Sequence, residues 1–138
     1  MYDMYQEIIL NHYRSPRNFG PLPDADRTGE ESNPLCGDHI MFRLKLDASA
    51  QKIAQVRFEG DGCAISMASA SMLAQRLDGM TVADAQKLTR DDVIGALGIP
   101  LSPVRLKCAL TGFSALGHAL HPGPTAATPP PSAPRAEG

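Results

Sequence analysis

Three cysteines and one aspartate are the residues of this 138-residue chain whose settings suit metal or sulfur chemistry. The segment NPLCGD places Cys36 and Asp38 two residues apart, with a glycine between them. Side chains alternate in direction along an extended chain, so the thiol and the carboxylate should point the same way. Both share their parity with Ile40 and Phe42. We therefore expect them at the end of a row of side chains that faces the core.

The other two cysteines lie in settings that favour the ionised thiol. Cys63 follows the glycines of GDGC, where a predicted strand gives way to a predicted helix. The positive end of a helix dipole favours a thiolate there. Cys108 directly follows Lys107 and shares a helical face with Arg105. Because the thiolate is the form that binds metal ions or attacks sulfur, both cysteines are candidate ligands or nucleophiles.

Two interpretations fit these residues. A cysteine outside a disulfide is among the most buried residue types, and each of the three could be a small packed hydrophobe. If the four side chains converge instead, three thiolates and one carboxylate complete a tetrahedral set for a divalent ion such as zinc. A carboxylate holds a thiophilic ion less firmly than a thiolate does, so Asp38 would be the labile ligand. Such a site suits transfer better than permanent binding.

The elements that would position these residues begin with a predicted hairpin. Residues 40–46 alternate apolar and polar side chains, and after a polar turn Ala54, Val56 and Phe58 alternate with polar neighbours. The two runs indicate paired antiparallel strands with one buried face. His39 has the opposite parity and is expected to be a solvated surface residue. The Pro- and Gly-rich segment 15–34 is expected to be a long loop with room for a short edge strand.

Helical periodicity appears on both sides of the hairpin. Residues 2–14 form a predicted amphipathic helix whose apolar face contains Tyr2, Tyr5, Ile9 and Tyr13. Ser and Pro are good first residues for a helix, and they precede the run that contains Cys108. The further helices are expected over residues 64–77, 82–88 and 91–97, and from Ser102 or Pro103 to about Leu120.

Composition and charge limit the class of protein. An apolar content of 43% suits one globular domain. A net charge of -2, no Trp and 5% aromatic residues give no reason to expect nucleic acid or an anionic membrane as partner. No stretch is apolar enough to span a membrane and no signal-peptide pattern is present, so the expected location is the cytoplasm. Residues 122–138 are rich in Pro and Ala and are predicted to be disordered.

Four segments together resemble the signature segments of the U-type iron–sulfur cluster assembly proteins, the IscU, SufU and NifU N-terminal family. They are YQEIILNHYRSPRNFG, NPLCGD, FEGDGCAISMASASML and VRLKCAL. The resemblance implies an α+β fold, with a small antiparallel sheet of about three strands packed against several helices, in a domain over residues 1–121. It also implies that Cys36, Asp38, Cys63 and Cys108 hold zinc, iron or a transient [2Fe–2S] cluster.

The resemblance further implies that a cysteine accepts persulfide sulfur from a SufS- or IscS-like cysteine desulfurase, and that iron–sulfur acceptor proteins act downstream. The Lys107–Cys108 pair is similar to SufU, in which Cys36 would accept the sulfur. The short stretch between Cys63 and Cys108 lacks the insertion usual in SufU and is similar to IscU, in which Cys108 would accept it. Arg105 matches a basic position of both branches and joins Cys36 and Cys108 as a candidate catalytic residue.

The expected function is therefore a scaffold or a sulfur carrier, of a kind that includes zinc-dependent sulfurtransferases. The alternative is a small binding module in which zinc has a purely structural role. A cysteine hydrolase would need a histidine close to a thiol. Nothing in the sequence connects His12 or His118 with a cysteine.

Overall fold

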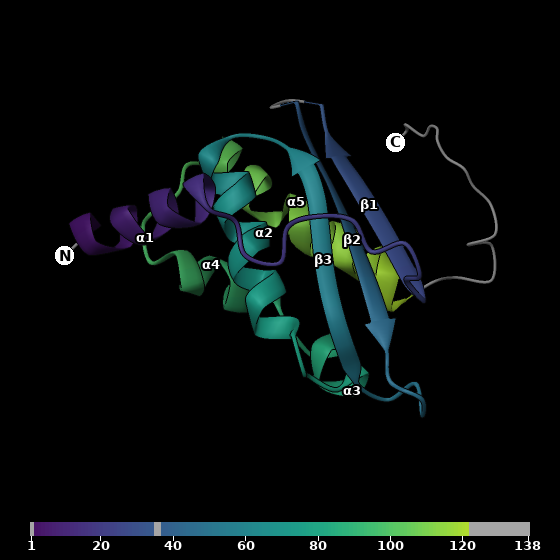
Figure 1. Ribbon diagram of the computed structural model, residues 1–138. Coiled ribbons are helices and arrows are strands. Elements are labelled where there is room, and N and C mark those ends of the chain that lie inside the picture. Colours follow the sequence, from purple (N-terminus) through teal and green to yellow (C-terminus); the bar gives the residue numbers. More distant parts are fainter. Residues whose placement is uncertain (1, 35–36, 122–138) are drawn as a thin grey trace.

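The computed structural model describes residues 2–34 and 37–121 and has the expected α+β fold, with helices packed against one face of a three-stranded antiparallel sheet (Figure 1). The strands lie in the order β1-β2-β3. In chain order the elements are α1 (Tyr2–Arg14), β1 (Arg27–Asn33), β2 (Asp38–Leu46), β3 (Ile53–Asp61), α2 (Ala64–Leu77), α3 (Val82–Gln86), α4 (Arg90–Leu97) and α5 (Pro103–Leu120). These bounds agree closely with the ranges that the sequence predicts.

The central strand β2 carries the core-facing row. Its side chains alternate strictly between buried and partly exposed positions, as its sequence predicts. Ile40, Phe42 and Leu44 are fully buried under the helices. The edge strand β1 pairs with β2 antiparallel, and its last residue, Asn33, lies opposite Asp38. Asp38 thus occupies the final inward-facing position of the row, at one end of the sheet.

The pairing of β2 with β3 corrects one prediction. Ala54 was expected on the buried face, but it is exposed, and Ile53 is buried in its place. The register shifts between Lys45 and Leu46, so that Ile53 lies opposite Leu46. A bulge inserts one residue that has no cross-strand partner and reverses the inward and outward sense of the chain beside it.

Small residues let the last helix approach both the sheet and α2 closely. A Cβ on Gly29 of β1 would lie 2.2 Å from the backbone oxygen of Ala115 in α5. A Cβ on Gly112 of α5 would lie 3.2 Å from that of Ala70 in α2. At Gly29 a larger residue would require a backbone shift, and at Gly112 the side chain of Ala70 would have to move by a few tenths of an ångström. The start of α2 and the second turn of α5 meet at one end of the sheet.

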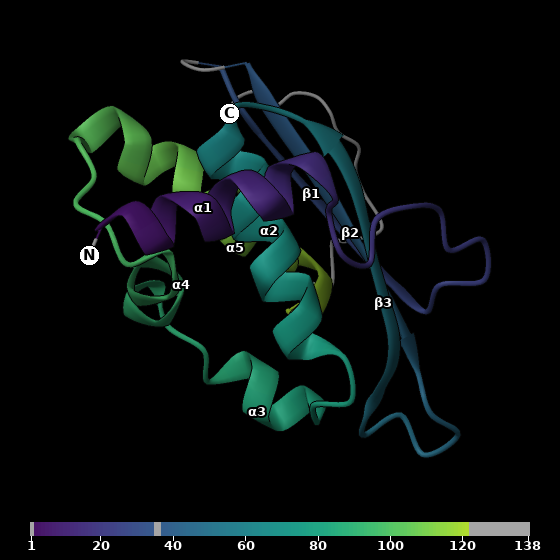
Figure 2. The same ribbon diagram turned by 60° about the vertical axis from the view of Figure 1, so that its left-hand side comes forward.

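The buried face of α1 differs from the prediction. Ile9 is buried as expected, but Tyr13 is 45% exposed, and His12 is buried beside Ile9. His12 Nδ1 forms a hydrogen bond of 2.7 Å with Ser71 Oγ, because α1 lies across α2 (Figure 2). A buried imidazole needs such a polar partner, and this partner is not visible in the local sequence. The side chains of Tyr2 and Tyr5 lie outside the described part of the structure.

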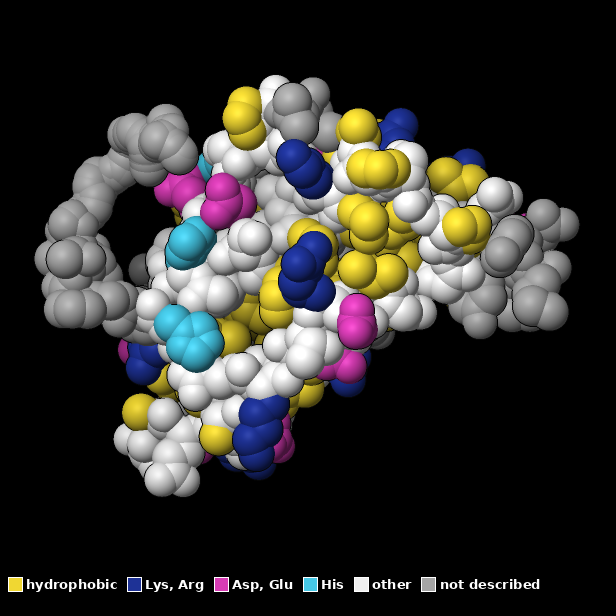
Figure 3. Space-filling view, turned by 180° about the vertical axis from the view of Figure 1, so that it is seen from behind, with side chains coloured by type: hydrophobic (Ala, Val, Ile, Leu, Met, Phe, Trp, Pro, Cys, Tyr) yellow, Lys and Arg dark blue, Asp and Glu magenta, His cyan; other side chains and the backbone are white. Residues whose placement is uncertain are grey.

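The helical side of the molecule is partly apolar on its surface. Figure 3 shows hydrophobic side chains gathered toward the end that carries the N-terminus, with positive side chains among them. Within residues 2–34 and 37–121, no helix has the length and apolar character needed to cross a membrane. The cytoplasmic location and the disorder of residues 122–138, which lie outside the described residues, stay predictions.

Candidate metal centre

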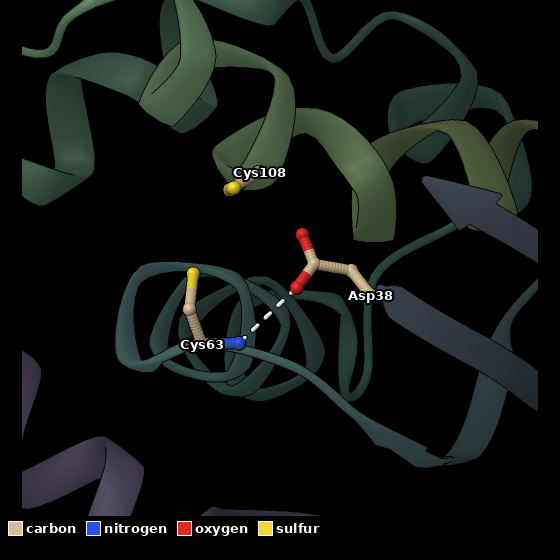
Figure 4. Close-up of side chains that lie close together, drawn as sticks. All are labelled: Asp38, Cys63 and Cys108. Atoms are coloured by element: carbon tan, nitrogen blue, oxygen red, sulfur yellow. Dashed lines mark hydrogen bonds between the residues drawn. The ribbon is translucent and has the colours of Figure 1, made fainter. Parts of the chain in front are cut away.

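Three of the four predicted ligands meet at one end of the sheet. Ligand atoms of Asp38, Cys63 and Cys108 all lie within 4.8 Å of one another. They come from the first residue of β2, the residue that caps α2 and the second turn of α5 (Figure 4). Cys36, the fourth predicted ligand, lies outside the described residues.

Asp38 is held by the backbone of the next element. Its carboxylate is almost fully buried, with 1% of the residue exposed. One oxygen, Oδ1, accepts a hydrogen bond of 3.1 Å from the backbone N–H of Cys63 (Figure 4). The other oxygen, Oδ2, is buried and has no hydrogen-bond partner among the described residues. The backbone therefore fixes one oxygen and leaves the second available to a ligand.

Glycine is required just before Cys63. A Cβ on Gly62 would lie 2.6 Å from Asp38 Oδ1 and 3.0 Å from Ser66 Oγ. Real Cβ atoms do not approach other atoms so closely, so any larger residue would displace the carboxylate or the start of α2. The GDGC segment therefore positions Asp38 as well as Cys63.

The two cysteines differ in exposure. Cys63 is partly exposed at the N-cap of α2, and its side chain makes no capping hydrogen bond. The thiol therefore remains available while the positive end of the helix dipole favours its anionic form. Cys108 is fully buried in α5. A partner molecule can reach Cys63 more directly than Cys108.

Arg105 supplies positive charge at this site. It is an exposed residue one turn before Cys108. The pKa of the Arg105 guanidinium is raised. The largest cause is attraction to the Cys63 sulfur, followed by a hydrogen bond to that sulfur and by the charge of Cys108. Lys107 is also exposed, but it lines an open groove with Glu31 and Phe113. Arg105 is therefore the cation that the contacts connect with the two sulfurs.

The donor set suits a thiophilic cation. Two sulfurs and a buried carboxylate oxygen without a hydrogen-bond donor surround a common point, and an uncompensated buried carboxylate is costly. Zinc and the iron of iron–sulfur clusters bind thiolates, and zinc also accepts a carboxylate. The residues present thus fit either group. Asp38 oxygen is the hardest donor of the set.

The three histidines considered from the sequence make their contacts outside the group of Asp38, Cys63 and Cys108. His39 is a surface residue, as expected, and it pairs with Glu30. His118 Nε2 lies 2.9 Å from Glu31 Oε1, and His12 is bonded to Ser71. The contacts of His12 and His118 thus give no support to a cysteine hydrolase.

Two residues near the ligands were not singled out from the sequence. From the sequence, Gly62 was only one of the glycines of GDGC that precede Cys63, and Ser66 was only one residue of the helix predicted over residues 64–77. Ser66 follows Cys63 by three residues, which places the two on the same side of the first turn of α2. That spacing is the only local signal, because the contact with Asp38 depends on the tertiary fold.

Known proteins resemble both the sequence and the fold. A family model described as the NifU-like N terminal domain matches residues 4–123. The zinc-dependent sulfurtransferase SufU of Bacillus subtilis is 34% identical over 130 residues, with 82% of this chain and 86% of SufU covered. The iron–sulfur cluster assembly scaffold protein IscU of Aquifex aeolicus is 37% identical over 112 residues, with 81% of this chain and 71% of IscU covered.

A solved structure agrees with these relatives. The crystal structure of an iron–sulfur cluster assembly scaffold protein for the SUF system from Fervidobacterium islandicum AW-1 superimposes with a TM-score of 0.73 at 27% identity. The match covers 86% of this chain and 98% of that one. Fold and site together define a small α+β protein in which an aspartate and two cysteines lie close enough together to hold a metal ion. The chain belongs to the NifU-like N-terminal family, the U-type scaffold proteins of iron–sulfur cluster assembly.

Proposed function

We propose that this protein binds zinc, or iron within a transient [2Fe–2S] cluster, through Cys36, Asp38, Cys63 and Cys108, and accepts sulfur from a cysteine desulfurase. The observation that carries the proposal is the meeting of Asp38, Cys63 and Cys108 within 4.8 Å from three separate elements. The names of the relatives, a zinc-dependent sulfurtransferase and a cluster scaffold, support the same chemistry. Iron–sulfur acceptor proteins would receive the product.

Each residue has a distinct role in this proposal. Cys63 and Cys108 anchor the metal, and Cys36 is the third thiolate. Asp38 is the ligand that leaves when a partner offers a replacement, because its oxygen binds a thiophilic ion least firmly. A bound metal ion keeps the cysteines deprotonated and ready for exchange. Arg105 offsets the negative charge of the sulfurs beside it.

Sulfur transfer needs no external oxidant or reductant. A thiolate of this protein attacks the terminal sulfur of the persulfide on the desulfurase. A new S–S bond forms, the S–S bond of the donor breaks, and the desulfurase cysteine leaves as a thiolate. The full burial of Cys108 argues against it as the first acceptor. Of the two acceptors that the family resemblance offers, Cys36 and Cys108, we therefore propose Cys36.

The test begins with metal analysis of protein purified without added metal, followed by anaerobic incubation with a desulfurase, cysteine and iron. We expect bound zinc, stimulated desulfurase turnover, and an additional sulfur atom that mass spectrometry locates on Cys36. The Cys36→Ser variant should carry no added sulfur. If the protein binds zinc but neither stimulates the desulfurase nor forms a coloured cluster, the proposal is wrong. The protein would then be a small binding module with structural zinc.

A further inference from the structure

A second buried polar atom lies beside the proposed ligands. Ser66 in the first turn of α2 is fully buried, and its Oγ has no hydrogen-bond partner in the described part of the chain. A buried hydroxyl without a partner is destabilising by about 1–3 kcal/mol. The packing of the described residues gives this hydroxyl no stabilising role, so we looked for a role at the neighbouring ligands.

The other buried serines of α2 show that this is not a general property of the helix. Ser69 Oγ donates a hydrogen bond of 2.7 Å to the backbone oxygen of Ala109. Ser71 Oγ is bonded to His12 and to the backbone N–H of Arg17. Both hydroxyls hold neighbouring elements together. Ser66 is on the same helix and equally buried, but its hydroxyl has no such partner among the described residues.

The position of Gly62 shows what Ser66 faces. The point that a Cβ of Gly62 would occupy lies 3.0 Å from Ser66 Oγ and 2.6 Å from Asp38 Oδ1. The serine hydroxyl and the carboxylate therefore both border a space that exists because residue 62 has no side chain. Oδ1 already accepts one hydrogen bond, from Cys63 N–H, and a carboxylate oxygen can accept a second.

We propose that Ser66 is a positioning residue for Asp38. When Oδ2 of Asp38 binds the metal, the Ser66 hydroxyl donates a second hydrogen bond to Oδ1, and Gly62 keeps the path between them open. Carboxylates that bind metals are oriented in this way by outer hydrogen bonds, and loss of such a partner lowers metal affinity by about 10–100-fold. Ser66 thereby determines how firmly the most labile ligand is held. This inference rests on the proposed metal site.

The experiment compares Ser66→Ala with Ser69→Ala in the full chain, using zinc as the probe. We expect Ser66→Ala to weaken zinc binding, measured by competition with a chromophoric chelator, by about tenfold or more. Without metal, its denaturation midpoint should be unchanged or higher, because an unsatisfied hydroxyl is removed. Ser69→Ala should show the reverse pattern of effects on zinc affinity and stability. It loses a hydrogen bond between α2 and α5 but no contact with the ligands. Its zinc affinity should be unchanged and its denaturation midpoint lower.

A double-mutant cycle separates positioning from packing. In the Asp38→Ala background the Ser66→Ala change should no longer affect zinc affinity, because the group through which Ser66 acts is absent. The spectrum of the cobalt-substituted protein should change between wild type and Ser66→Ala, but not between Asp38→Ala and the double variant. Equal zinc affinity in wild type and Ser66→Ala, or an equal loss in both backgrounds, would overturn the inference. A wild-type protein that binds no zinc would instead overturn the proposed function from which it starts.

Discussion

The first turn and the middle of α2 differ in how their buried polar groups are satisfied. In the middle, Ser71 joins His12 of α1 and the backbone of Arg17 in a network in which each partner comes from the chain itself. In its first turn, Ser66 Oγ and the nearby Asp38 Oδ2 are equally buried and have no hydrogen-bond partner among the described residues. The first arrangement fixes the position of α1.

The contrast shows how to distinguish a structural polar group from a functional one in the same helix. Buried polar atoms are nearly always hydrogen-bonded, and each exception requires an explanation. At the Ser71 network the chain satisfies its own atoms, so nothing external is needed. At the first turn, the buried Asp38 carboxylate lies beside two sulfurs, and a cation would compensate its charge. The following variants test this distinction, from the largest expected effect to the smallest.

Loss of a sulfur ligand should have the largest effect. Cys63→Ser should weaken zinc binding by more than about a hundredfold, beyond the usual cost of losing an outer-shell partner. Cys63 is partly exposed, so the exchange of sulfur for oxygen should alter the metal-free fold little. At saturating zinc, each hundredfold loss of affinity removes about 2.7 kcal/mol of metal-dependent stabilisation. Thermal denaturation with and without zinc measures this difference. Equal stabilisation of wild type and variant by zinc would contradict the ligand assignment.

Gly62→Ala should disturb the metal site by displacing the Asp38 carboxylate. The added methyl would lie 2.6 Å from Asp38 Oδ1, and relief of such overlap costs about 1–3 kcal/mol. We expect a lower free energy of unfolding in urea and weaker zinc binding. Gly117→Ala in α5 is the matched control, because a Cβ there has nothing within 4 Å. That change should stabilise the protein by up to about 1 kcal/mol through helix propensity. Similar results for the two variants would show that Gly62 has no special role.

Ser71→Ala should affect only the network in the middle of α2. The substitution leaves the ring nitrogen of His12 and the N–H of Arg17 without their partner, which costs about 1–3 kcal/mol in the free energy of unfolding. Zinc affinity should stay at the wild-type value, because neither group contacts the ligands. Urea denaturation and chelator competition on the same samples provide both quantities. Weaker zinc binding in Ser71→Ala would show that the first turn and the middle of α2 are coupled.

The sequence was most informative where a local pattern decides the outcome. Alternation along residues 40–46 predicts the buried row of β2 and, by parity, the inward direction of Asp38, which the structure shows. The bulge that exposes Ala54 and the burial of His12 were not predicted, because each depends on a partner distant in the chain. The importance of Ser66 was missed for the same reason. Its environment is determined by where Asp38 lies, and that position is a property of the assembled sheet.

The smallest expected effect is a pH dependence of stability at the Ser71 network. Burial, and then the positive charge of Arg17, lower the pKa of His12 below its ordinary value of 6.5. The folded protein therefore keeps His12 neutral where the unfolded chain binds a proton. The free energy of unfolding should fall as the pH decreases through about 6.5, and the loss should stop below the pKa of the folded state. Urea denaturation of metal-free protein between about pH 7.5 and 5.5 measures this slope, which His12→Leu should reduce because it removes the ionisable group. An identical slope in both proteins would mean that the buried imidazole accepts a proton without loss of its contact with Ser71. The network in the middle of α2 would then tolerate a charge that its burial is expected to exclude.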